Sequence, residues 1–180
     1  MSSETPRILT DPKELAFLRV QDCPMLVLSD NVWSWISWRI KGHTSGHYNH
    51  AMWLLDPAHV ASQGWRFRMG ALRPYLNGRY RLKFWRNPNW TPEQRLELRA
   101  GLLRDLRAGG RYDWLGIIGQ RLGLRWINFT NRSYCSEQAG KVLGLVEPTF
   151  RVEHPSPADL DKWCKDSPQM KVWGVFDPTL

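Results

Sequence analysis

A cysteine at the start of a short predicted helix carries the clearest chemistry in this sequence. Cys135 follows a run of loop-favouring residues and precedes apolar residues at helical spacing, Ala139, Val142 and Leu143. We expect this helix to stop at Gly144, which would take the C′ position after its last turn. A helix N-terminus favours negative charge, so a thiol there ionises more easily, and the thiolate is the reactive form. The pattern predicts a nucleophile at Cys135, although a small buried core cysteine would give the same local pattern.

A thiol nucleophile needs a base within hydrogen-bond reach and a third group that orients the base. These partners must be close in space and need not be close in sequence. His50 opens a predicted buried strand, residues 50–55, directly after a polar loop at residues 41–49. We therefore take Cys135 and His50 as a candidate nucleophile and base.

The same histidine belongs to a second pattern, which could bind a metal. His43, His47 and His50 are spaced closely enough to act as three ligands. Gly42 and Gly46 disfavour the helix that would align the first two, and His50 fits better on the strand. The sequence also lacks a C-x-x-C pair, since its three cysteines are Cys23, Cys135 and Cys164. We expect no metal, no other cofactor and no disulfide framework.

Composition indicates one globular domain with a basic surface. The chain has 180 residues, of which 23% are charged and 42% hydrophobic. We expect residues 1–20 to form a partly disordered N-terminal arm and residues 21–180 a single domain. The formal net charge of +8 and the 11 Trp residues favour an anionic partner, such as nucleic acid, a lipid surface or a cell-wall polymer.

The N-terminus has neither the basic start nor the apolar run of a signal peptide, and no stretch is long enough to span a bilayer. We therefore expect synthesis in the cytoplasm. A role at the cell wall would then need another route of delivery, such as a phage. The oligomeric state stays open.

Strands and helices alternate along the chain in a way that indicates an α+β fold. Apolar runs predict strands at residues 24–28, 50–55, 60–69, 79–85 and 170–176. Helices are expected at residues 13–18, 32–40, 92–108, 115–122 and 155–160, in addition to the helix of Cys135. The helix at 92–108 has the strongest signal, because Thr91 and Gln94 form a capping box and Pro92 takes the first position. Its Leu96 and Leu103 mark one side.

Two segments of the chain resemble a known group of enzymes. The segment Gly46-His47-Tyr48-Asn49-His50-Ala51-Met52 and the segment Tyr134-Cys135-Ser136-Glu137 resemble motifs of the circularly permuted papain-like hydrolases of the YiiX and YaeF type, in the NlpC superfamily. The histidine precedes the cysteine, as the permutation requires. Residues 23–40, 91–113 and 155–160 also resemble segments of that group, so the likeness covers roughly residues 23–163.

The resemblance implies a permuted papain-like fold, with a small antiparallel sheet packed against helices and the nucleophile at a helix N-terminus. Cys135 would attack a carbonyl carbon and His50 would act as the base. The helix backbone, with Tyr134, would bind the oxyanion. The third catalytic residue lies on the strand after the histidine and aligns with Gln63, with two neighbouring alternatives, Ser62 and His59.

The function implied is a cysteine hydrolase that cleaves an amide bond through an acyl-enzyme, with a peptidoglycan peptide as the expected substrate. One alternative is a hydrolase or acyltransferase acting on lipid or fatty-acyl amides and esters. Another is a non-enzymatic module that binds polyanions or nucleic acid through the basic strand at residues 79–86. The chain has no signature of a specific nucleic-acid-binding fold, so we expect no specific nucleic acid partner.

Overall fold

The structure is a computed structural model that describes residues 7–31, 47–63, 66–109, 111–112, 132–133 and 135–178. The helices predicted at residues 32–40 and 115–122 lie outside the described residues. So do the predicted oxyanion residue Tyr134 and the possible metal ligand His43.

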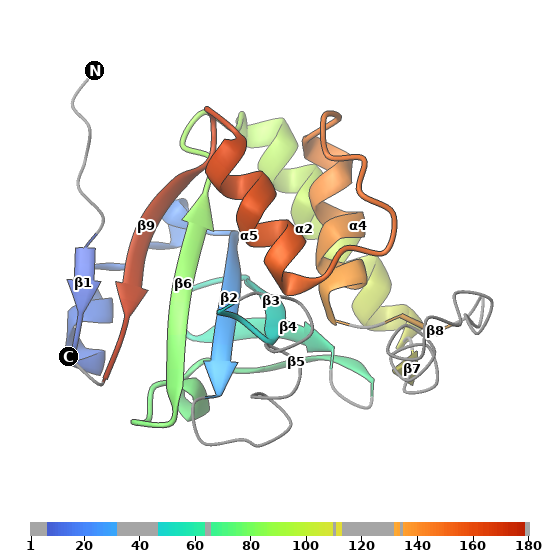
Figure 1. Ribbon diagram of the computed structural model, residues 1–180. Coiled ribbons are helices and arrows are strands. Elements are labelled where there is room, and N and C mark those ends of the chain that lie inside the picture. The colour runs from blue at the N-terminus through green and yellow to red at the C-terminus, as the bar shows by residue number, and fades with distance from the viewer. Residues whose placement is uncertain are drawn as a thin grey trace.

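Within the described residues the chain forms a mixed seven-stranded sheet in the order β1-β9-β6-β2-β3-β4-β5 (Figure 1). Neighbouring strands are antiparallel except for β1 and β9, which run parallel. The predicted α+β class is confirmed, but the sheet is larger than the small antiparallel sheet that we expected. The strands are β1 (Arg7–Leu9), β2 (Met25–Asn31), β3 (His50–Leu54), β4 (His59–Gln63), β5 (Phe67–Ala71), β6 (Tyr80–Arg86) and β9 (Lys171–Phe176). A separate parallel pair joins β7 (Arg111–Tyr112) to β8 (Arg132–Ser133).

The chain before residue 21, predicted as an arm, contributes to the domain from residue 7 onward. Strand β1 pairs with β9, and a 3-10 helix at Pro12–Phe17 follows it. The side chains of Leu9, Leu15 and Leu18 are buried. A three-residue strand is too short to show a periodicity, so the sequence did not reveal it.

The strand predicted at residues 60–69 is two strands. Gln63 of β4 pairs with Phe67 of β5, so the chain reverses direction between them. Strand-like residues continue on both sides of this reversal, and the sequence pattern therefore does not mark it. The resulting hairpin places β5 at the edge of the sheet.

Both faces of the central strand β2 are buried, since the side chains of four successive residues are inaccessible to solvent: Met25, Leu26, Val27 and Leu28. Leu26 and Leu28 join the core beneath the helices, whereas Met25 and Val27 join a second core on the opposite face. This alternation follows from the period of two along a strand. It gives the sheet a rigid centre on which the helices are fixed.

Three described helices pack together on one side of the sheet (Figure 1): α2 (Pro92–Ala108), α4 (Cys135–Val146) and α5 (Pro157–Asp166). Helix α2 has the predicted bounds, because Thr91 accepts a 3.2 Å hydrogen bond from the backbone of Gln94, and Gly109 ends the helix in the left-handed conformation. Its buried residues are Leu98, Gly101 and Leu102, so the side marked by Leu96 and Leu103 faces solvent. No described helix has both the length and the apolar character needed to cross a membrane.

Candidate active site

Cys135 is the first residue of α4 and so lies in the first turn, where the sequence predicts it, and its side chain is buried. The residues expected on the same helix face, Ala139, Val142 and Leu143, are buried as well. The helix continues past Gly144, where the sequence predicted it to stop, and ends at Val146. The thiol therefore combines a place in the first turn of a helix with a position on the inward face.

The first turns of α4 are held by contacts on three sides. Trp53 of β3 donates a 3.3 Å hydrogen bond to the backbone oxygen of Ala139. Gln138 bonds to Asp105 of α2. At Gly140 an added Cβ atom would come within 2.8 Å of Pro155 and 2.9 Å of Phe150, so the connection to α5 packs directly on the helix backbone. These contacts fix the thiol relative to the strand that carries His50.

His50 opens β3, as predicted, and its side chain is hydrogen-bonded to Cys135. Burial opposes a charge on the imidazole. Attraction to the Cys135 sulfur and the hydrogen bond with it outweigh this effect, so the pKa of His50 is raised above its ordinary value. The structure thus brings together two residues that are separated by almost half of the chain.

The thiol shows the complementary shift. Burial opposes ionisation of Cys135, but attraction to His50, the hydrogen bond with it and backbone hydrogen bonds from Ala51 and Ser136 lower the pKa of the thiol below its ordinary value. These neighbours stabilise a thiolate facing an imidazolium. Such an ion pair is the reactive state of a cysteine nucleophile.

Ser62 is the third member of this group. Its Oγ lies 2.9 Å from Nε2 of His50. Met52 of β3 pairs with Ser62 of β4, and His50 lies two residues before Met52 on the same face, which makes His50 and Ser62 diagonal neighbours. The hydroxyl therefore fixes the orientation of the ring.

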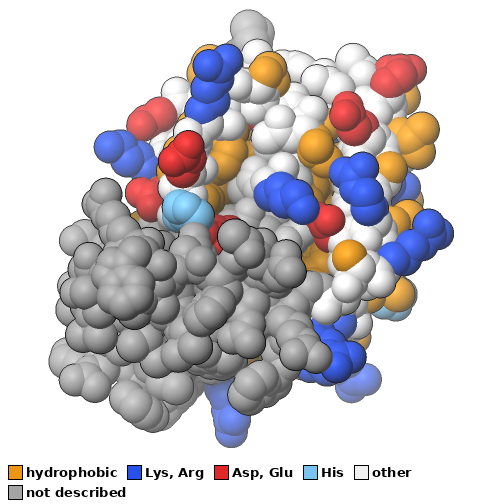
Figure 2. Space-filling model, turned by 90° about the vertical axis from the view of Figure 1, so that its right-hand side faces the viewer, with side chains coloured by type: hydrophobic (Ala, Val, Ile, Leu, Met, Phe, Trp, Pro, Cys, Tyr) orange, Lys and Arg blue, Asp and Glu red, His pale blue; other side chains and the backbone are white. Residues whose placement is uncertain are grey.

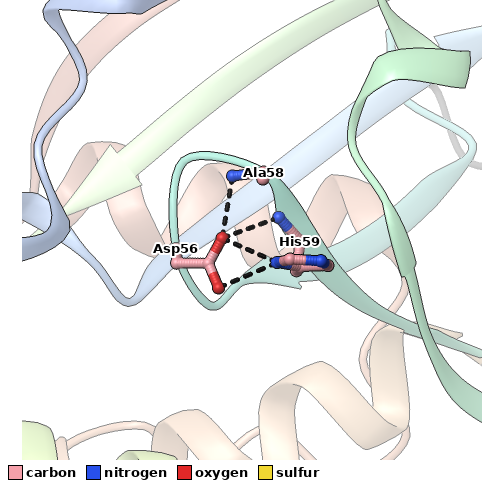
Figure 3. A network of polar contacts seen from close by, with 3 residues as sticks. All are labelled: Asp56, Ala58 and His59. Carbon is pink, nitrogen blue, oxygen red and sulfur yellow. Dashed lines mark hydrogen bonds and ion pairs between the residues drawn. The ribbon is translucent and has the colours of Figure 1, made fainter.

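The other two candidates for the third position occupy different places on β4. Gln63, which aligned best, is buried, and its side chain points to the face opposite to that of Ser62 because neighbours alternate along a strand. His59 lies at the far end of β4, where its backbone N–H and ring Nδ1 both bond to Asp56 in the turn before the strand (Figure 3). The sequence did not select Ser62 because the choice depends on the register between β3 and β4.

The basic strand that suggested a polyanion site is largely neutralised. In β6, Arg81 pairs with Asp177, Lys83 with Asp161 and Arg86 with Asp22. On the face shown in Figure 2, Lys and Arg side chains are interspersed with Asp and Glu over the described part of the chain. Several tryptophans are also buried, namely Trp53, Trp85, Trp90 and Trp173. These features belong to the core and its ion pairs.

Among the described residues, no three or more His, Cys, Asp or Glu side chains lie close enough together to hold a metal ion. His50, the described residue common to the metal pattern and the catalytic pattern, is engaged by Cys135 and Ser62.

The fold has a counterpart among solved structures. It is similar to the crystal structure of the metalloprotein YiiX from Escherichia coli O157:H7, described as DUF1105, with a TM-score of 0.58 and 18% sequence identity. The similarity covers 84% of this chain and 96% of that chain. No protein-family model and no curated protein matches the sequence. The YiiX-like fold that the two short motifs suggested is thus supported across most of the domain.

Proposed function

We propose that this protein is a cysteine hydrolase of the permuted papain-like type, which cleaves an amide bond through an acyl-enzyme. The observation that carries the proposal is the hydrogen bond between the Cys135 thiol, in the first turn of α4, and His50. The shifted pKa values of the two groups agree with a thiolate and imidazolium pair. The similarity to YiiX supports the fold that such a site requires.

In the first half of the reaction, the thiol proton of Cys135 moves to His50. The sulfur then forms a bond to the substrate carbonyl carbon, and the π electron pair of the carbonyl moves to its oxygen. Backbone N–H groups at the start of α4 point toward this end of the helix and would stabilise the oxyanion. When the intermediate collapses, the carbon–nitrogen bond breaks and His50 gives its proton to the departing amine.

In the second half, His50 takes a proton from water, and the hydroxide attacks the thioester carbon. The carbon–sulfur bond breaks, the acid is released and the thiolate of Cys135 returns. The reaction uses only the groups of the chain and water. Although the similar YiiX protein is described as a metalloprotein, the described residues here offer no donor set for a metal, so no step is assigned to one.

Ser62 would act as the orienting residue in place of Gln63. Its hydroxyl at 2.9 Å from Nε2 leaves Nδ1 as the ring nitrogen that exchanges the proton with the thiol. A hydroxyl orients the ring without adding charge, so the imidazolium gains less stabilisation than a carboxylate would give. The ion pair with the thiolate would supply most of that stabilisation.

The substrate that we propose is a peptide amide within an anionic cell-wall polymer. The net charge of +8 favours a polyanionic substrate, although the basic side chains of β6 are already paired. Those same ion pairs weaken the alternative of a nucleic-acid-binding module.

A second candidate, a hydrolase or acyltransferase for lipid amides or esters, is favoured by a different observation. Val20, Leu96 and Leu103 are large apolar side chains that are about half exposed or more. Arg95 and Arg99 of α2 bond to the backbone of Gln21 and Val20, respectively, so these exposed residues belong to adjacent elements. An apolar surface next to arginines suits the surface of an anionic bilayer.

The proposal is tested first with p-nitrophenyl acetate, a small acylating probe. We expect the native protein to release p-nitrophenolate and to gain one acetyl group at Cys135, read by mass spectrometry. Cys135→Ala should do neither. Acylation that persists in this variant would rule out the thiol mechanism.

The substrate class is then tested on purified peptidoglycan and on anionic phospholipid vesicles. A cell-wall peptidase releases free amines from peptidoglycan, whereas a lipid hydrolase releases fatty acid from the vesicles. In either case Cys135→Ala should abolish the product, and it serves as the matched control for contaminating activities.

A further inference from the structure

The residue after the proposed nucleophile contains a buried polar atom that has no hydrogen-bond partner among the described residues. Ser136 is fully buried, and in the described structure its Oγ makes no hydrogen bond. A buried hydroxyl without a partner destabilises a protein, because it has lost its hydrogen bonds to water and gained none in return. Such groups are rare in native proteins and each needs a physical explanation.

The surroundings of Ser136 restrict where a partner could come from. Its side chain shares a helix face with Gly140 one turn later, and that position is closed by Phe150 and Pro155. The Cα–Cβ bonds of an α-helix tilt toward the helix N-terminus, so the Ser136 hydroxyl leans toward the end of α4 where Cys135 lies. An acceptor would therefore have to approach it from the side of the reacting thiol.

The reaction proposed above generates an acceptor there. Attack by Cys135 turns a carbonyl oxygen into an oxyanion next to the first turn of α4. The backbone N–H of Ser136 already donates a hydrogen bond to the Cys135 sulfur. The hydroxyl of Ser136 is therefore the additional donor that this serine can offer. Hydrogen bonds from fixed donors to an oxyanion are among the strongest contributions to catalysis in a site closed to water.

We propose that Ser136 is a further catalytic residue, whose hydroxyl donates a hydrogen bond to the oxyanion formed at Cys135. This inference rests on the proposed cysteine hydrolase function and extends it. The hydroxyl has no partner in the part of the free protein that the structure describes, and it would gain one in the tetrahedral intermediate. Such an interaction lowers the barrier because it is absent in the ground state.

The test compares two reactions of the same thiol. Acylation by p-nitrophenyl acetate passes through an oxyanion, whereas alkylation by iodoacetamide is a direct displacement at carbon and forms none. In Ser136→Ala we expect the rate of acylation to fall by about 10²–10³-fold, which is the effect of removing one oxyanion donor. The alkylation rate of Cys135 should stay unchanged. The melting temperature should not fall, because the variant removes an unpaired buried polar group.

Three outcomes would overturn the inference. Acylation of Ser136→Ala at the native rate would mean that the hydroxyl does not contact the oxyanion. An equal fall in alkylation and acylation would place its effect on the thiol instead. If the native protein shows no acylation that depends on Cys135, the proposed function fails, and this inference fails with it. Ser136→Gly removes the same hydroxyl and provides a second variant if the alanine protein does not fold.

Discussion

Cys135 and Cys164 are both buried thiols on helices that cover the same face of the sheet, yet their chemistry is expected to be opposite. Burial and the carboxylate of Asp161 raise the pKa of Cys164 above its ordinary value. Cys135 is also buried, but its contact with His50 lowers its pKa. Cys23 resembles Cys164 in this respect, since burial raises the pKa of Cys23 to about 12. Burial alone therefore produces an inert thiol, and the partner decides which cysteine reacts.

The two helices also use charge differently. In α5, Asp161 accepts hydrogen bonds from Lys83 and Trp85 of β6, and it pairs with Lys165 on its own helix. This network joins α5 to the sheet, and its carboxylate is already paired with two lysine side chains in the resting protein. At the start of α4, the proposed mechanism creates the charges on Cys135 and His50 by proton transfer between the two groups, and the reverse transfer removes them. One region uses ion pairs for structure, whereas the proposed mechanism uses an ion pair in the other region for reactivity.

Of the variants considered, His50→Ala should change the difference in reactivity between Cys135 and Cys164 the most. The variant keeps the burial of Cys135 but removes the cation that offsets it, so the pKa of the thiol should rise. Near neutral pH we expect alkylation of Cys135 by iodoacetamide to fall by about 10²-fold or more, as for loss of a catalytic base. The measurement is the labelling rate of each cysteine against pH, read by mass spectrometry.

The pH at which each cysteine becomes labelled distinguishes the thiols in the native protein. Because the pKa of Cys135 is lowered, this residue should label well below the range near pH 8.5 where a free thiol ionises. Cys23 and Cys164 should label only after unfolding, and they serve as internal controls. Equal labelling of all three cysteines in the native protein would contradict the difference in thiol pKa between Cys135 and the other two.

A smaller effect, on stability, is expected from Asp161→Ala. The change leaves the Lys83 ammonium and the Trp85 N–H buried without their acceptor. Removing one partner of a buried ion pair destabilises a protein by about 3–5 kcal/mol. The free energy of unfolding, measured in urea, should fall accordingly, while the labelling rate of Cys135 in the folded protein stays the same.

A second variant separates the effect of the charges of Lys83 and Asp161 on stability from the effect of how their side chains pack. Lys83→Met combined with Asp161→Leu removes both charges, and it should recover part of the lost stability. In the native protein burial opposes ionisation of Asp161, but Lys165 and Lys83 outweigh this effect and lower its pKa. The ionised Asp161 therefore stabilises the fold above about pH 4, and this stabilisation is lost as the pH falls further. A double variant as unstable as Asp161→Ala would contradict the role given to the charges.

Much of this architecture could be predicted from local signals. The bounds of α2 followed from Thr91, Pro92 and Gly109, and the inward face of α4 followed from its helical spacing. These features depend on residues within one or two turns of each other. The positions of Cys135 and His50 at the starts of their elements were predicted for the same reason.

The remaining features depend on contacts between distant segments. The sequence pattern does not show where β4 turns into β5, and it does not fix the register that sets Ser62 against His50. The partners of the β6 cations come from three separate parts of the chain, Asp22, Asp161 and Asp177. A basic strand that looked exposed in sequence is therefore paired in the fold. The unpartnered hydroxyl of Ser136 likewise becomes visible only once its neighbours are placed.

The smallest expected effect concerns the choice of Ser62 over the other residues considered for the third position. Ser62→Ala removes the oxygen that lies 2.9 Å from Nε2 of His50. A neutral hydrogen bond contributes about 1 kcal/mol, so we expect a loss of roughly fivefold to tenfold in acylation by p-nitrophenyl acetate. The matched control is His59→Ala, on the same strand, whose ring bonds to Asp56 instead. This control should keep the native acylation rate and lose only a little stability. If His59→Ala slowed acylation while Ser62→Ala did not, the orienting role would belong to another residue, and the register of β3 and β4 would not explain the site.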